Sequence, residues 1–202
     1  MKISFFGGSF NPPTYAHLNI AVDSLRQLNV DKLFFVPVGN TYKKPYLIDE
    51  KYRYEMLEIM CNNEKNISVE NIEMNQKNNI STIKAFEMIE SKYKKIYENI
   101  EIYYVMGADN FIKLPNWYNA EKLMQRQYII FKRNDINLEK IIKENKLLKN
   151  YSKNFKILEL NENKEYHSGI IRDLVKKQNF EEAEKYTKPE IIEYIKKKKI
   201  YK

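Results

Sequence analysis

The sequence predicts an α/β fold in which an open parallel sheet carries helices on both faces. Short apolar runs rich in Ile, Val, Phe and Tyr alternate along the chain with stretches of helical period. Successive runs lie roughly 30 residues apart, the length of a strand–helix–strand unit with a right-handed crossover. The C-terminal part shows helical periodicity, so a short helical segment should close the chain. This pattern is typical of a Rossmann-like fold.

The elements follow from these periodicities. The expected strands are Lys2–Phe6, Leu33–Pro37, Ile67–Met74, Ile100–Met106, Tyr128–Lys132 and Phe155–Leu160. The helices between them are expected at Tyr15–Leu28, Asp49–Asn63, Ile80–Tyr93, Tyr118–Gln125 and Leu138–Lys149, and the closing helices at Ser168–Lys176, Glu181–Tyr186 and Pro189–Lys199. Ligands of such sheets bind beyond the carboxyl ends of the strands. Residues 7–17, 39–44 and 107–117 are therefore the places to look for a site.

Length and composition indicate a single domain over residues 1–202. The chain lacks an apolar run of bilayer length and an export signal, which favours a cytoplasmic protein without a membrane partner. Its one cysteine, Cys61, rules out an internal disulfide. The formal net charge of +8 comes from lysines spread along the chain, which argues against a nucleic-acid partner and suits small polyanionic substrates. The oligomeric state stays open, and a homo-oligomer is compatible with the sequence.

The segment after the first strand carries the strongest functional signal. Gly7 and Gly8 are expected to let the backbone turn sharply and to let a ligand approach. A helix should begin near Thr14, with His17 in its first turn. Free backbone N–H groups and the positive end of the helix dipole favour an anion there. The sequence predicts a phosphate site at this point.

This segment resembles the GxFxPxHxxH signature of the nucleotidylyltransferase superfamily, in its nicotinate/nicotinamide mononucleotide adenylyltransferase branch. His17 matches the last histidine, and Thr14 stands in the place of the first. The Thr-x-x-His spacing is similar to the eukaryotic form of these enzymes.

Further segments are similar to motifs of the same branch. Residues 36–44 resemble its VPxxxPPHK loop, with Lys44 on the lysine. Arg53 matches a family arginine, although an exposed helix arginine is an equally ordinary interpretation. Thr82 matches the threonine of SYTxDT, while Lys84 replaces the aspartate and Ser81 could serve as a helix cap.

The remaining motifs lie in the second half of the chain. Gly107, Asp109 and Trp117 match the G-[AST]-D-x4-L-x2-W element of the branch, and the tryptophan could equally be a core residue. Residues 166–172 resemble ISSTxIR, with Ser168 and Arg172 retained and with His167 and Gly169 as departures. Residues 188–201 are similar to the family's terminal VPxxVxxYIxxxxLY.

The resemblance implies adenylyl transfer from ATP to nicotinate mononucleotide, giving deamido-NAD and pyrophosphate without a covalent intermediate. It implies catalytic roles for His17, Lys44 and Arg172. The residues it implies for ATP are Gly7, Gly8, Ser9, Phe10, Thr14, His17, Gly107, Asp109, Ser168 and Arg172, and those for the mononucleotide are Asn11, Lys44, Thr82 and Trp117. Mg²⁺ is expected to arrive with ATP, since the sequence shows no carboxylate cluster of its own for a metal.

Three alternatives remain at this point. The same fold could use nicotinamide mononucleotide or phosphopantetheine as acceptor, and Trp117 with the terminal element argues against phosphopantetheine. The departures at Thr14, His167 and Gly169 would suit a nucleotide sensor without activity. The third alternative is a basic nucleic-acid-binding module. The 16 tyrosines of the chain could stack on bases, but they are dispersed along the sequence and form no cluster.

Overall fold

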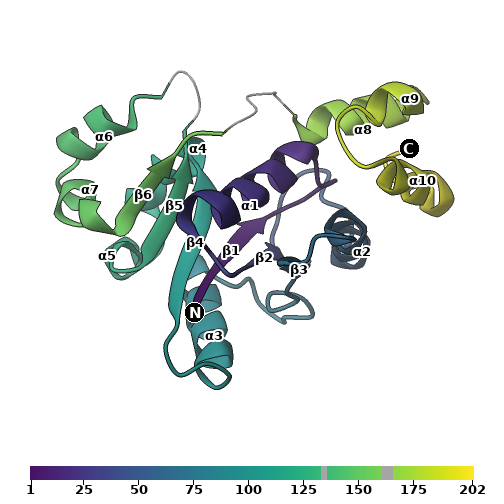
Figure 1. The fold of residues 1–202 in the computed structure, drawn as a ribbon. Helices are drawn as coiled ribbons and strands as arrows, with labels where there is room; N and C mark the ends of the chain where they lie inside the picture. The colour runs from purple at the N-terminus through teal and green to yellow at the C-terminus, as the bar shows by residue number, and fades with distance from the viewer. Residues whose placement is uncertain (133–135, 161–165) are drawn as a thin grey trace.

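A computed structural model describes residues 1–132, 136–160 and 166–202 and confirms the α/β fold (Figure 1). The strands are β1 (Lys2–Gly8), β2 (Lys32–Pro37), β3 (Ile67–Val69), β4 (Glu101–Gly107), β5 (Gln127–Phe131) and β6 (Phe155–Leu158). They form one sheet in the order β3-β2-β1-β4-β5-β6, and every pairing is parallel. This is the strand order of a Rossmann-like sheet.

Helices cover both faces of the sheet. The helices are α1 (Tyr15–Leu28), α2 (Glu50–Cys61), α3 (Thr82–Lys94), α4 (Ala108–Phe111), α5 (Ala120–Met124), α6 (Leu138–Glu144), α7 (Lys146–Asn150), α8 (Ser168–Lys176), α9 (Phe180–Ala183) and α10 (Pro189–Lys198), with 3₁₀ turns η1 (Leu114–Asn116) and η2 (Ser152–Asn154). Apolar side chains of α1, α2 and α8 to α10 form one core cluster, and those of α3 to α7 form the other. Among the described residues, no helix has the length and apolar character that crossing a bilayer requires.

The site region is set by the position of β1 at the centre of the sheet. β1 pairs with β2 on one side and with β4 on the other. After β1 the chain continues to β2 on one side, and β4 lies on the other side of β1. The loops after β1 and β4 therefore run in opposite directions from the carboxyl ends of these two strands. A crevice at this switch point is where open α/β sheets bind ligands.

Several predicted elements are shifted by one to three residues at their ends, among them Glu181–Tyr186, which is α9 (Phe180–Ala183), and two differ by more. The predicted strand Ile67–Met74 is wrong beyond Val69, because residues 71–74 form a turn in which Met74 N–H donates to the Asn71 carbonyl at 2.9 Å. The predicted helix Leu138–Lys149 is two helices. Asn145 ends α6, and its side chain accepts from the N–H groups of Leu147 and Leu148, which caps α7 and competes with a continuous helix.

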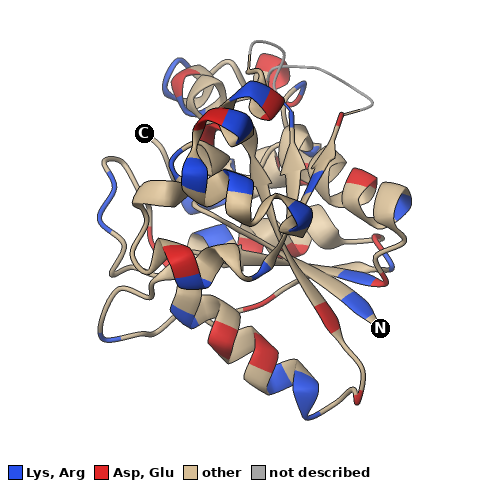
Figure 2. Cartoon of the chain, turned by 90° about the vertical axis from the view of Figure 1, so that its left-hand side faces the viewer, with Lys and Arg blue, Asp and Glu red and all other residues tan. Residues whose placement is uncertain are grey.

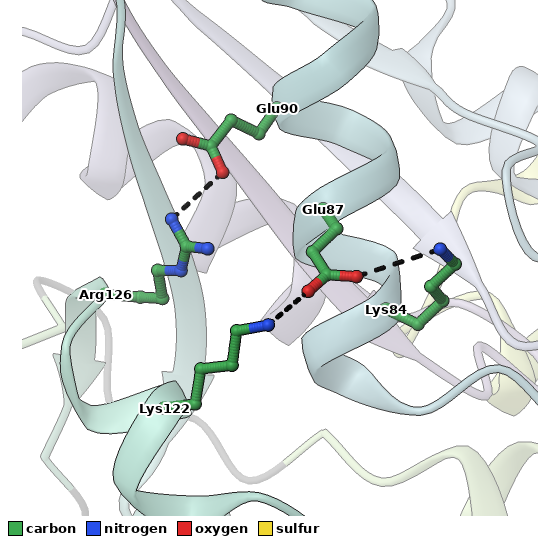
Figure 3. Close-up of polar contacts among 5 residues, drawn as sticks. All are labelled: Lys84, Glu87, Glu90, Lys122 and Arg126. Carbon is green, nitrogen blue, oxygen red and sulfur yellow. Dashed lines mark hydrogen bonds and ion pairs between the residues drawn. The ribbon is translucent and has the colours of Figure 1, made fainter.

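Charged residues are mixed on the surface. Figure 2 shows Lys and Arg interspersed with Asp and Glu over the helices and loops of one side of the molecule. An example is the cluster between α3 and α5 in Figure 3, where Lys84 and Lys122 both pair with Glu87 and Arg126 pairs with Glu90. The pairs to Glu87 are solvent-screened and contribute little to stability.

Candidate active site

Gly7 and Gly8 end β1 and do not form the expected glycine turn. They pair with Val36 and Pro37 in regular parallel register, and no glycine of the described residues has a positive φ. Glycine is needed there for space. A Cβ on Gly7 would lie 2.7 Å from the Tyr104 hydroxyl, and one on Gly8 would lie 2.9 Å from the Phe10 ring. The turn itself is made by Phe10, whose φ is 46°.

The loop between β1 and α1 is held by its carbonyl oxygens. Side chains from α2, α8 and the segment before α10 donate hydrogen bonds to it. The bonds run from Arg53 Nη1 to the Ser9 carbonyl (3.1 Å), from Arg172 Nη1 to that of Asn11 (2.7 Å), from Ser168 Oγ to that of Pro12 (2.7 Å) and from Thr187 Oγ1 to that of Pro13 (2.9 Å). The two bonds from the hydroxyl groups are neutral, and each contributes about 1 kcal/mol net to stability. The carbonyls of this loop therefore face the protein.

The N–H groups of the same loop are left available. Within the described part of the chain, the backbone N–H groups of Ser9, Phe10 and Asn11 donate no hydrogen bond. Buried or half-buried backbone donors are nearly always paired in native proteins. Successive free N–H groups form a cavity for an anion, so this loop has the donors that a phosphate group needs.

His17 stands at the start of α1 in a defined protonation state. Its Nδ1 accepts from the Thr14 N–H at 3.0 Å and lies 2.9 Å from the Thr14 hydroxyl. Its ring packs edge-on against Phe10, with centroids 5.0 Å apart. Burial lowers the pKa of His17 from 6.5 to about 4. At neutral pH the ring is uncharged, and because Nδ1 accepts a backbone N–H, the proton is on Nε2. Nε2–H is then a positioned donor.

Arg53 is a buried support of this loop. The interpretation as an exposed helix arginine is wrong, since the residue is 0% exposed. Besides Ser9, its guanidinium donates to the carbonyls of Ile48 (3.0 Å) and Val38. Burial lowers its pKa, and the nearby Glu50 carboxylate opposes this effect. Arg53 thus ties the loop after β1 to the loop after β2.

The loop after β2 brings Lys44 to the same place. Lys44 Nζ donates to Ser9 Oγ at 3.1 Å, so these two predicted site residues are neighbours. A cavity of about 400 Å³ opens in this loop. It is lined by Asn40, Tyr42, Lys43, Lys44, Pro45 and Leu47. An ammonium group at its edge can act as a point charge on a phosphate.

A second cavity lies between the start of α3 and the segment after Trp117. Its volume is about 330 Å³, and Ser81, Lys84, Tyr118 and Lys122 are among its lining residues. Trp117 is half-buried and packs against the core cluster beneath it. Ser81 takes the N-cap position of α3, yet its hydroxyl makes no capping hydrogen bond. Thr82 follows as the first residue of the helix.

Gly107 and Asp109 stand at the end of β4. Gly107 has an ordinary φ of −81°, and a Cβ there would meet nothing within 4 Å. Neither backbone conformation nor packing of the protein itself requires a glycine at this position. Asp109 lies half-buried in the first turn of α4. The space that a Cβ on Gly107 would occupy is therefore open.

A buried carboxyl adjoins these loops. Glu73 is 8% exposed, and its backbone carbonyl lies 2.3 Å from the position of a Cβ on Gly39, which explains the glycine there. Burial raises the pKa of Glu73 to about 8, and the Arg53 guanidinium opposes this shift. Across the described ranges, no group of three or more His, Cys, Asp or Glu side chains could hold a metal ion.

The structure therefore places most predicted residues around one crevice. The loop 7–11, Thr14, His17, Lys44, Ser168 and Arg172 form one cluster by direct contact. Sequence analysis missed the roles of Thr187 and Tyr201, which bond to this loop from the far end of the chain. The similarity of residues 188–201 to a family motif was the only signal for this end, and it did not indicate a contact.

Comparison with known proteins decides the family. The Cytidylyltransferase-like family model matches residues 5–174. A relative from Campylobacter jejuni (serotype O:23/36, strain 81-176), named "Probable nicotinate-nucleotide adenylyltransferase", is 32% identical over 88% of this chain and 96% of its own length. The chain belongs to the nicotinate-nucleotide adenylyltransferase family. The resemblance inferred from the motifs is confirmed.

Other members of the family extend the match to the whole chain. A protein of the same name from Caldicellulosiruptor bescii is 29% identical over the full length of both chains. The solved structure of Plasmodium falciparum nicotinic acid mononucleotide adenylyltransferase complexed with NaAD has a TM-score of 0.76. It is 24% identical and covers 99% of this chain and 97% of its own. This likeness supports the adenylyltransferase fold.

Proposed function

We propose that the protein transfers the adenylyl group of ATP to nicotinate mononucleotide, giving deamido-NAD and pyrophosphate. The observation that carries this proposal is the loop after β1, whose free N–H groups stand beside the uncharged ring of His17. In the reaction, a phosphate oxygen of the mononucleotide attacks the α-phosphorus of ATP in line, and pyrophosphate leaves. The attacking phosphate is already ionised at neutral pH, so no general base is needed.

The ATP phosphates are proposed to lie over the loop 7–11 and the start of α1. His17 Nε2–H would donate to an oxygen of the α-phosphate, where negative charge develops in the transition state. Lys44 lies 3.1 Å from Ser9 and would neutralise charge at the same loop. Arg172 spends one N–H on the Asn11 carbonyl, which leaves the rest of its guanidinium for the β- and γ-phosphates, together with the start of α8.

The adenosine is proposed to lie over the end of β4. Gly107 needs no glycine for the protein's own sake, and the absence of a Cβ would let adenosine approach the backbone. Asp109 would accept from a ribose hydroxyl. Phosphate binding by the loop after β1 and adenosine binding after β4 would place ATP across the switch point of the sheet.

The mononucleotide is proposed to bind near the start of α3, where the cavity is lined by Ser81 and Tyr118, the sequence neighbours of Thr82 and Trp117, and not by Thr82 and Trp117 themselves. The exposed part of the Trp117 indole would stack on the pyridine ring. Thr82 would face its phosphate or ribose, with Lys44 at the boundary to ATP. Asn11 was predicted to bind the mononucleotide, and its side-chain oxygen and nitrogen both bond to the protein. We therefore propose that Asn11 supports the loop and does not contact the mononucleotide.

Magnesium is proposed to enter as the ATP complex, because the described residues offer no acidic cluster to hold it. Catalysis would then rest on positioning and on charge stabilisation by His17, Lys44 and Arg172. We place the reaction in the cytoplasm and expect no nucleic-acid partner.

The test is to follow pyrophosphate release with ATP and magnesium and with each mononucleotide in turn. We expect turnover with nicotinate mononucleotide and a lower kcat/KM with nicotinamide mononucleotide. Equal or higher kcat/KM with the amide would overturn the acid preference. Tight ATP binding without pyrophosphate release would identify a sensor, and salt-sensitive retention of oligonucleotides without turnover would identify a nucleic-acid module.

A further inference from the structure

The end of the chain folds back into the protein after α10. Lys199 and Tyr201 have φ values of 56° and 62°, both in the left-handed region. This conformation is uncommon for bulky residues and persists where the surrounding structure holds it. The two reversals carry the Tyr201 side chain inward, and the residue is 9% exposed.

The Tyr201 hydroxyl contacts the loop after β1 through the side chain of Asn11. It donates a hydrogen bond to Asn11 Oδ1 at 2.7 Å. At the other end of the same amide, Asn11 Nδ2 donates to the Tyr46 carbonyl at 2.8 Å. The backbone N–H of Ile48 also approaches Oδ1, at 3.5 Å. Because a hydroxyl donor and a carbonyl acceptor hold its two ends, the amide has a single orientation.

Asn11 is consequently the point at which three segments meet. Its side chain joins the loop after β1, the loop before α2 and the end of the chain, and its carbonyl accepts from Arg172 at 2.7 Å. Asn11 also closes the run of three free N–H groups that begins at Ser9. Because these contacts fix Asn11, they anchor the end of the segment whose backbone angles, at residues 9 and 10, set the directions of those N–H groups.

We propose that Tyr201 is a positioning residue for adenylyl transfer. Its hydroxyl fixes the Asn11 amide and so aims the N–H groups of residues 9–11 at the phosphates of ATP. The proposal rests on the proposed function. It assigns a role in ATP binding to the end of the chain, which lies 190 residues from Asn11.

The matched control is Tyr194, which lies one turn before the end of α10. Its hydroxyl donates to a carboxylate oxygen of Glu55 on α2, and the residue is half-buried. Tyr201→Phe and Tyr194→Phe each remove one hydroxyl and one hydrogen bond and keep the aromatic ring. Only the first bond touches the loop that carries the free N–H groups.

The experiment begins with wild-type pyrophosphate release, whose absence would refute the proposed function itself. In Tyr201→Phe we expect kcat/KM for ATP to fall about five- to tenfold, as for the loss of one hydrogen bond, with a raised KM for ATP. The KM for the mononucleotide should not change. Tyr194→Phe should keep both KM values and kcat. In a cycle with Asn11→Ala, the two losses in kcat/KM for ATP should be strongly non-additive.

Several outcomes would overturn the proposal. One is a Tyr201→Phe variant with wild-type KM and kcat. Another is a fall in kcat with the KM values of both substrates unchanged, which signals less folded enzyme. The same holds if Tyr201→Phe unfolds at the assay temperature, since the hydroxyl then supports the fold itself, or if the losses in the cycle simply add.

Discussion

Replacing His17 with alanine should cost turnover far more than binding. The ring is held by two contacts from Thr14, at 3.0 Å and 2.9 Å, which leave Nε2–H as its one free donor. Loss of one preorganised donor to developing charge lowers kcat by about 10²- to 10³-fold, or about 2.7–4 kcal/mol of transition-state stabilisation. Thr14→Val keeps the backbone contact and loses only the hydroxyl, so about a fivefold fall is expected.

Steady-state pyrophosphate release, with both substrates varied, measures these losses. Asn137→Ala is the control, because its side chain caps α6 by accepting from Lys140 N–H at 2.9 Å, far from the crevice. It should cost about 1 kcal/mol of stability and leave kcat unchanged. A His17→Ala enzyme with kcat within threefold of wild type (about 0.6 kcal/mol) would refute the reasoning.

The same residue gives a pH prediction. Since burial lowers the pKa of His17 to about 4, kcat should show no titration of this group near pH 6.5. The unfolded histidine binds a proton between pH 6.5 and 4 and the folded one does not. Its contribution to the free energy of unfolding is therefore complete above about pH 6.5 and is lost as the pH falls toward 4. A wild-type kcat that follows a pKa near 6.5 and becomes flat in His17→Ala would contradict this.

Three further predictions concern the surroundings of the crevice. Burial raises the pKa of Glu73 to about 8, so its stabilising effect is complete below about pH 4.5 and is lost as the pH rises through 8. Glu73→Gln should flatten thermal stability over this range, and an unchanged pH profile would count against it. Arg53→Met leaves three carbonyl groups without their hydrogen-bond donor. It should lower the free energy of unfolding by about 3 kcal/mol or more, measured in urea. The control Lys140→Met removes an ion pair to Glu144 whose side chains are 68% and 65% exposed, so it should cost no more than about 1 kcal/mol, and equal losses would disprove the buried role. Trp117→Ala should raise the KM for the mononucleotide more than that for ATP, and Trp117→Phe should largely restore it; equal effects on both substrates would exclude stacking.

The sheet could be predicted from hydrophobic periodicity, because the pattern that distinguishes a strand from a helix lies within each short segment of the sequence. The apolar runs that became β1, β2 and β4 are continuous, as expected of strands buried on both faces. The error at β3 arose where Glu70 and Glu73 interrupt such a run. Both carboxyls are buried, and Glu70 is held by Lys92 and by the Tyr93 hydroxyl, contacts that sequence patterns do not reveal.

The site was predictable by its residues and only partly by its geometry. Gly7 and Gly8 were expected for the conformation of a turn, and they serve the approach of Tyr104 and Phe10. Arg53 could be exposed or buried on any local argument, because its acceptors lie 5 to 44 residues away. Bonds of this range depend on tertiary packing, which is also why the role of Tyr201 had no local signal.

The most direct test is a crystal structure of the protein with a non-hydrolysable ATP analogue. The α-phosphate should lie over the loop after β1, with one of its oxygens about 2.7–3.1 Å from His17 Nε2 and others facing the N–H groups of Ser9 to Asn11. An analogue bound with its phosphates away from His17, while the loop N–H groups contact only solvent, would contradict the account.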